Sequence, residues 1–281
     1  MTEKIVVGVT GASGSRRAVD WAAARAIARR QHLELVSVIG GAIGTVGEGS
    51  VLAAAQTATE ELLRDEADRI AAEGLVVTTR VATGNPVNVL IEASEDAALL
   101  VIGSDYRGPG EGPARGSHGI RIAAASASPV VVVPDFDVVG ERSGVVVGVD
   151  GSPTSEAAIA FAAAEADRLG EPLTAIIVWT PIAAPRNALM VVPHAYREGM
   201  EQSAREALSL SLAGIRGQYP GIEIEEAIAE GYPSAVINEL AESARLTVVG
   251  SRGHGVVRRL LLGSISHEVL QRLATVTAVV R

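Results

Sequence analysis

Residues 145–155 read VVVGVDGSPTS, and this short stretch decides the fold. The β-branched run before Asp150 is typical of a buried strand. Ser152 followed by Pro153 is typical of a helix start, because serine caps the first turn and proline needs no amide hydrogen bond there. The predicted helix continues to Leu169, and Gly170 ends it. A buried strand that leads at once into a helix is the building unit of parallel sheets.

The same pattern occurs earlier in the chain, as IVVGVTGASGS at residues 5–15. At an offset of 140, 11 of the 22 positions from 5 to 26 are identical. A second block, 84–104, matches 231–251 at 10 of 21 positions. Strands and helices alternate through each copy, up to a last strand at 130–133 or 276–280. The sequence therefore predicts an α/β fold: two tandem, doubly wound, open parallel-sheet domains (Rossmann-like, five strands each) over residues 1–140 and 141–281.

Composition narrows the protein class. The chain has 281 residues, 48% of them hydrophobic, and no cysteine, which excludes disulfides, thiolate metal sites and cysteine nucleophiles. We find no secretion signal and no apolar run of the roughly 20 residues that a membrane span needs, so we expect a cytoplasmic protein without a membrane partner. The formal net charge is −9 and neither half is basic, which argues against nucleic-acid binding.

Ligands of doubly wound sheets bind at the carboxyl ends of the strands. The turn of Asp150 and Gly151 lies there, as does the stretch VVGSRGHGVVRRLLLGSIS at 248–266. This stretch has glycines at 250, 253 and 263, and Ser264 follows. Phosphate binding needs open backbone N–H groups, a hydroxyl donor and a helix N-terminus. The N–H groups of Ser264, Ile265 and Ser266 and the charge of Arg252 fit that need. The spacing alone also fits a glycine-rich connection that ends in a serine-capped helix.

Other phosphate and catalytic signatures are missing from the sequence. There is no Gly-x4-Gly-Lys-Ser/Thr loop, and no Gly-x-Gly-x-x-Gly follows a first strand. The five histidines have no metal-ligand spacing, and no Ser/His/Asp arrangement is evident. We therefore predict no catalytic residue and no metal site of the protein's own.

Four motifs together resemble the universal stress protein family: VGVDGS at 147–152, Gly231-x-Pro233, VVGSRG at 248–253 and LGSIS at 262–266. The resemblance covers nearly the whole chain, twice. It implies an adenine nucleotide ligand, ATP with or without Mg²⁺. The resemblance implies that the phosphates bind to Gly250, Gly253, Gly263 and Ser264. It also implies that Asp150 recognises the nucleoside and that the backbone of Val178 contacts adenine. The resemblance also implies pairing through the last strands, which would relate the two domains by a pseudo-twofold axis. A homo-oligomer, a dimer of tandem chains, stays open.

The first copy departs from this pattern. Residues 103–117 read GSDYRGPGEGPARGS, with Gly103, Gly116 and Ser117 at the same spacing as in the second copy but Tyr106 in place of the middle glycine. Thr10 replaces the first-strand Asp, while Val38 matches Val178. A tyrosine is bulky and disfavours a positive φ. We predict that the second copy binds ATP and that the first is weak, altered or empty; the alternative that both sites fill stays open.

Three functions fit these observations. The leading one is an ATP-binding stress-response or regulatory protein without efficient turnover. The second is a slow ATPase or nucleotide hydrolase. No residue near the loop stands out as a base that could activate water, which is evidence against this function. The third is an interaction module with vestigial nucleotide sites.

Overall fold

The computed structural model describes residues 3–40, 48–104, 117–136, 141–181, 194–253 and 262–281. The chain forms two compact units, Met1–Asp137 and Val138–Arg281. Each unit is a parallel sheet with helices between successive strands, which confirms the predicted fold class. Among the described residues, no helix combines the length and the hydropathy that crossing a membrane requires.

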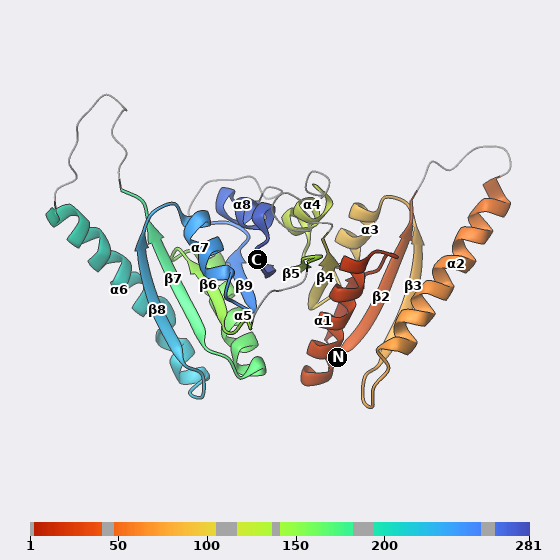
Figure 1. Cartoon of the computed structure of the whole chain (residues 1–281), viewed down its shortest axis with the longest axis horizontal. Coiled ribbons are helices and arrows are strands. Elements are labelled where there is room, and N and C mark those ends of the chain that lie inside the picture. Colours follow the sequence, from red (N-terminus) through yellow and green to blue (C-terminus); the bar gives the residue numbers. More distant parts are fainter. Residues whose placement is uncertain (1–2, 41–47, 105–116, 137–140, 182–193, 254–261) are drawn as a thin grey trace, which may run out of the picture. The chain divides into compact units, whose positions relative to one another are not determined.

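The first unit begins with a strand and alternates from there (Figure 1). Its elements are β1 (Lys4–Gly8), α1 (Ser13–Arg29), β2 (His32–Ile39), α2 (Glu48–Arg69), β3 (Val77–Thr83), α3 (Pro86–Ala93), β4 (Leu99–Gly103), α4 (Ser117–Ala125) and β5 (Val130–Val133). The strand order is β3-β2-β1-β4-β5, and each pairing is parallel.

The second unit repeats this order of elements. They are β6 (Val145–Val149), α5 (Pro153–Leu169), β7 (Leu173–Trp179), α6 (His194–Gln218), β8 (Ile224–Glu230), α7 (Pro233–Ala241), β9 (Leu246–Gly250), α8 (Ser264–Arg272) and β10 (Val276–Val280). The strand order is β8-β7-β6-β9-β10, again parallel throughout.

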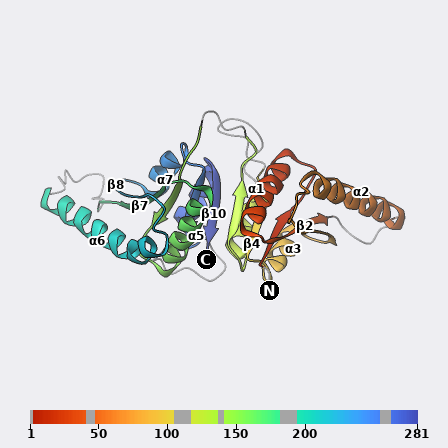
Figure 2. The same cartoon turned by 90° about the horizontal axis from the view of Figure 1, so that it is seen from below.

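Helices cover both faces of the second unit's sheet. Figures 1 and 2 show α5 and α6 on one face and α7 and α8 on the other. Strands covered on both sides need apolar residues on both sides, and this explains their continuous valine and isoleucine runs. Val145 and Val147 are fully buried in β6, as are Ile5, Val6 and Val7 in β1. The core is aliphatic, because only 3% of the chain's residues are aromatic.

The predicted start and end of the first helix in the second unit are confirmed. Ser152 is the N-cap of α5, and its side chain accepts a hydrogen bond from the Ser155 amide. Gly170 ends the helix in the left-handed conformation, with φ of 65°. The first unit builds the same junction differently, because its N-cap Ala12 has no capping side chain. There, Ser13 Oγ donates to Asp135 Oδ2 at 2.6 Å.

The strand order determines where a ligand can bind. In the second unit β6 lies between β7 and β9, so the chain moves to one side after β6 and returns later on the other. Such a switch point leaves a crevice at the carboxyl ends of the two central strands. Asp150 follows β6, and Gly250 ends β9. The predicted pairing of the last strands of the two domains stays a prediction.

Candidate functional site

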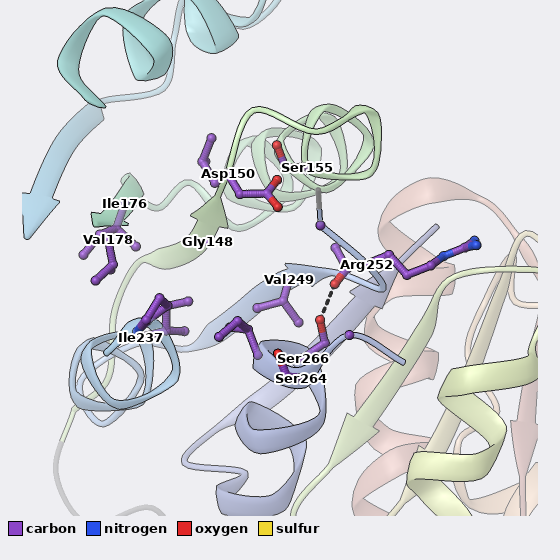
Figure 3. Close-up of a pocket in the computed structure, with 16 residues that line it drawn as sticks. Gly148, Asp150, Ser155, Ile176, Val178, Ile237, Val249, Arg252, Ser264 and Ser266 are labelled. Atoms are coloured by element: carbon purple, nitrogen blue, oxygen red, sulfur yellow. Dashed lines mark hydrogen bonds between the residues drawn. The ribbon is translucent and has the colours of Figure 1, made fainter. Parts of the chain in front are cut away.

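A cavity of about 290 Å³ opens at the carboxyl ends of the strands in the second unit (Figure 3). Of the ten residues predicted for this domain, the cavity is lined by Asp150, Val178, Gly250, Arg252, Gly253, Gly263, Ser264, Ile265 and Ser266. Gly151 is not in the lining. It has φ of 78°, a left-handed conformation that glycine adopts easily, and so it shapes the turn between Asp150 and Ser152. Residues 254–261 of the predicted loop lie outside the described residues.

One end of the cavity is apolar. Ile176 and Val178 come from β7, and Pro233 and Ile237 come from the start of α7. A Cβ atom added to Gly148 would lie 2.8 Å from Ile237 Cδ1, so the glycine in β6 lets α7 approach the sheet. Sequence reasoning missed Ile237 and Pro233 as cavity residues. The signal was present for Pro233, in the repeated Gly-x-Pro motif.

Asp150 lines the cavity from the turn after β6. Its Oδ1 accepts a hydrogen bond from the Ser152 amide at 3.0 Å, which fixes the carboxylate above the turn. A Cβ atom on Gly253 would overlap Asp150 Oδ2. Sequence reasoning offered two reasons against a side chain here, its bulk and a positive φ; the φ of Gly253 lies outside the left-handed region, so the second reason is wrong. Glycine is needed because the aspartate carboxylate occupies the space of a side chain.

The start of the predicted phosphate loop is tied to its surroundings. Thr154 Oγ1 donates to the Arg252 carbonyl at 3.0 Å, which joins the loop to the first turn of α5. Ser266 Oγ donates to the Gly250 carbonyl at 2.5 Å, and Gly263 N donates to the Ser251 carbonyl at 2.9 Å. These bonds hold the end of β9 against the start of α8 (Figure 3). The two ends of the loop therefore meet at the cavity.

The first turn of α8 borders the cavity. Gly263 is the N-cap and has no side-chain cap, so the serine-capped alternative is wrong in detail. Helix starts leave N–H groups without an intrahelical partner and carry the positive end of the helix dipole. Arg252 adds positive charge to the cavity lining. Burial, followed by the positive charge of Arg252, lowers the pKa of Arg281, so a second guanidinium lies near this end of the sheet.

The first unit has a smaller cavity, of about 180 Å³, at the matching place. Thr10, Val38 and Gly103 line it, as predicted for the weaker site. Ser117 begins α4, and Gly116 lies outside the described residues. A Cβ atom on Gly103 would overlap the carbonyl of Gly14 in α1. Close packing of the helix on the strand is thus enough to explain this glycine.

Comparisons with known proteins agree with this architecture. The universal stress protein family model matches residues 1–134 and 142–281. A universal stress protein of Mycolicibacterium smegmatis is 32% identical over 288 residues, covering 99% of this chain and 96% of the relative. The crystal structure of a universal stress protein from Archaeoglobus fulgidus has a TM-score of 0.71 at 21% identity and covers 99% of this chain and 96% of its own. Another universal stress protein, solved in complex with cAMP, is 26% identical over 50% of this chain, with a TM-score of 0.34. By its sequence, in both halves, the chain belongs to the universal stress protein family.

Proposed function

We propose that the second unit binds ATP in its cavity and that the protein acts as an ATP-binding stress-response or regulatory protein without efficient turnover. This proposal rests on the observation that residues distant in the sequence come together at one cavity. Predicted site residues from distant parts of the chain, at Asp150, at Val178 and within 250–253 and 263–266, line one cavity. Small-ligand sites have this character, an apolar enclosure with a few polar groups that fix orientation.

The two ends of the cavity suit the two ends of a nucleotide. Ile176, Val178 and Ile237 offer an apolar enclosure for a flat base. The opposite edge would hold the phosphates with the free amides of α8 and the guanidinium of Arg252. A Mg²⁺ ion, when present, would neutralise phosphate charge there. Asp150, a carboxylate, suits a neutral hydroxyl of the sugar and would repel phosphate.

Nucleotide carried by the purified protein tests this proposal. The protein is denatured, and the released small molecules are identified by mass spectrometry; the nucleotide-free protein is then titrated with ATP. We expect ATP binding by the wild type, and loss of on the order of tenfold or more in affinity for Asp150→Ala and Gly263→Ala. A Cβ atom on Gly263 meets its nearest atoms at 3.4 Å, so the alanine fits the fold and changes mainly the cavity.

Asp167→Ala is the matched control for Asp150→Ala. Asp167 is an exposed aspartate on α5, in the same unit and outside the cavity lining, so the variant loses the same charge without touching the site. Its ATP affinity should equal that of the wild type. ATP incubated with the wild-type protein should disappear no faster than in buffer. A wild type that carries no nucleotide and does not respond to added ATP would contradict the proposal.

A further inference from the structure

The hydroxyl of Ser155 lies at the cavity and has no role in the predicted site. Ser155 lines the cavity from the first turn of α5, beside Asp150 (Figure 3). It is 2% exposed, and within the described part of the chain its Oγ has no hydrogen-bond partner. Its amide donates to Ser152 Oγ, so the backbone that carries the hydroxyl is held in place. A buried hydroxyl without a partner destabilises a fold and therefore needs an explanation.

The repeat supplies a direct comparison for this hydroxyl. Ser15 occupies the same position in the first unit, where its Oγ accepts a hydrogen bond from the Thr10 amide at 2.8 Å. Ser15 is 5% exposed, so both serines are buried. In the first unit the hydroxyl stabilises the turn after β1. Both turns also have a bond from an amide to the side chain that follows the strand: the Ala12 amide donates to Thr10 Oγ1 at 3.3 Å, and the Ser152 amide donates to Asp150 Oδ1 at 3.0 Å. The difference between the turns is therefore the serine hydroxyl, which is bonded at Ser15 and has no partner at Ser155 among the described residues.

The chemistry of the two cavity groups indicates what they can bind together. A carboxylate accepts hydrogen bonds only, whereas a serine hydroxyl can donate as well as accept. A ligand hydroxyl can donate to Asp150 and at the same time accept from Ser155. Phosphate oxygens carry no proton to donate and would be repelled by the aspartate. A sugar hydroxyl fits this corner of the cavity.

We propose that Ser155 donates a hydrogen bond to a ribose hydroxyl of bound ATP, and that Asp150 accepts the proton of the same sugar. Ser155 is then a specificity-determining residue that favours ribonucleotides. This inference rests on the proposed function, because it assigns a role within the ATP site. It also explains why the buried hydroxyl of Ser155 has no partner among the described residues when no ligand is bound.

The test combines one substitution with one change in the ligand. Wild type, Ser155→Ala and the matched control Ser15→Ala are titrated calorimetrically with ATP and with 2′,3′-dideoxy-ATP, which lacks both sugar hydroxyls. For Ser155→Ala we expect ATP affinity to fall about tenfold, while dideoxy-ATP affinity changes less than about twofold. Ser15→Ala should leave the affinity for both nucleotides in the second unit unchanged.

Thermal unfolding without nucleotide provides the second readout. Ser15→Ala removes a formed hydrogen bond and should lower the unfolding temperature by a few degrees. Ser155→Ala removes an unpartnered hydroxyl and should leave the temperature unchanged or raise it. Equal losses of affinity for ATP and dideoxy-ATP, no loss for either, or a stability loss like that of Ser15→Ala would each overturn the role of Ser155 while wild-type binding of ATP stands. Absence of ATP binding by the wild type would overturn the proposed function and this inference together.

Discussion

The two cavities occupy the same place in the repeat, yet their bordering turns are built differently. In the second unit Thr154 Oγ1 bonds to the Arg252 carbonyl, and the cavity measures about 290 Å³. In the first unit the matching residue is Gly14, whose carbonyl lies directly against Gly103, and the cavity measures about 180 Å³. Without a side chain at position 14, α1 can approach the end of β4 more closely.

The serine hydroxyls of the two turns differ in their partners. Thr10 and Ser15 line the cavity of the first unit and are joined by a hydrogen bond from the Thr10 amide to Ser15 Oγ. Ser155 also lines the cavity of the second unit, but its Oγ has no partner among the described residues. The lesson is that one glycine spacing can serve two purposes. At Gly103 it allows α1 to pack closely on β4, and at Gly253 it leaves room for the Asp150 carboxylate.

The largest expected effect concerns the glycine at the end of each fourth strand. We expect Gly103→Ala to lower the free energy of unfolding of the first unit by about 3 kcal/mol, because the new methyl group would overlap backbone atoms of α1. Gly250→Ala should cost about 1 kcal/mol, since its nearest neighbours lie at 3.1 and 3.2 Å.

Urea unfolding followed by fluorescence can separate the two units. Trp21 lies in the first unit and Trp179 in the second, so Trp→Phe variants assign each transition. Gly214→Ala in α6 is the control, because nothing lies within 4 Å of its added Cβ and alanine favours a helix. It should stabilise the second unit by about 0.5–1 kcal/mol. If Gly103→Ala and Gly250→Ala lower the free energy of unfolding equally, the proposed packing difference between the two copies is contradicted.

The second effect concerns the residue that the first unit has already replaced. Gly253→Tyr gives the second unit the tyrosine found at position 106, and its side chain must compete with the Asp150 carboxylate for space. We expect a loss of ATP affinity on the order of 100-fold, measured by calorimetry. Gly253 is exposed, so the unit should stay folded, and its Trp179 transition provides the check. An unchanged affinity would mean that Tyr106 does not account for a weak first site.

The third effect is a pH dependence confined to the first unit. Glu34 in β2 pairs with Lys4 in β1 at 2.8 Å and with Arg80 in β3 at 2.8 Å. Burial opposes ionisation, but the hydrogen bonds from Lys4 and Arg80 outweigh it and lower the pKa of Glu34. Because the folded pKa lies below the unfolded one, this stabilisation is present above the unfolded value, about 4.3, and is lost as the pH falls through the folded value.

Glu34→Gln measures the size of that contribution. It should lower the stability of the first unit by about 1 kcal/mol at pH 7 and by less at pH 3. The second unit has Thr174 at the matching position and should show no such change. Urea titrations at the two pH values give the answer, and a cost that is the same at both would contradict the role of the ionised carboxylate.

The smallest effect concerns the hydrogen bond that ties the loop to α5. Thr154→Val keeps the shape of the side chain but removes the donor to the Arg252 carbonyl. We expect ATP affinity to fall about fivefold, because Arg252 and Gly253 are held less firmly. Thr57→Val, which removes a side-chain bond to the Ala53 carbonyl within α2 of the first unit, should leave affinity unchanged. Equal affinities for the two variants would show that the loop does not depend on Thr154.

The fold could be predicted because it depends on patterns that lie along the chain. Buried strands show as valine runs, Ser152 and Gly170 define one helix, and the repeat confirms the order of elements. The capping of α1 could not be predicted, because Asp135 reaches Ser13 from 122 positions away. Such a contact has no local signature.

The sequence motifs predicted the parts of the candidate site that depend on backbone positions. They predicted less well the parts that depend on contacts between side chains. Gly250, Gly253 and Gly263 all line the cavity, but the need for a glycine at 253 is steric and comes from the adjacent Asp150 carboxylate. Ser155 was overlooked because it is identical to Ser15 in sequence. Only the hydrogen bonds distinguish them, because Ser15 Oγ is bonded and Ser155 Oγ has no partner among the described residues.

The central claim is that the two units are unequal, and the number of ATP molecules bound per chain tests it most directly. Nucleotide-free, full-length protein is titrated with ATP by calorimetry, alongside Gly253→Tyr. The asymmetry predicts one site per chain in the wild type and loss of that site in the variant. Two equivalent sites in the wild type, or one site that survives Gly253→Tyr, would contradict it.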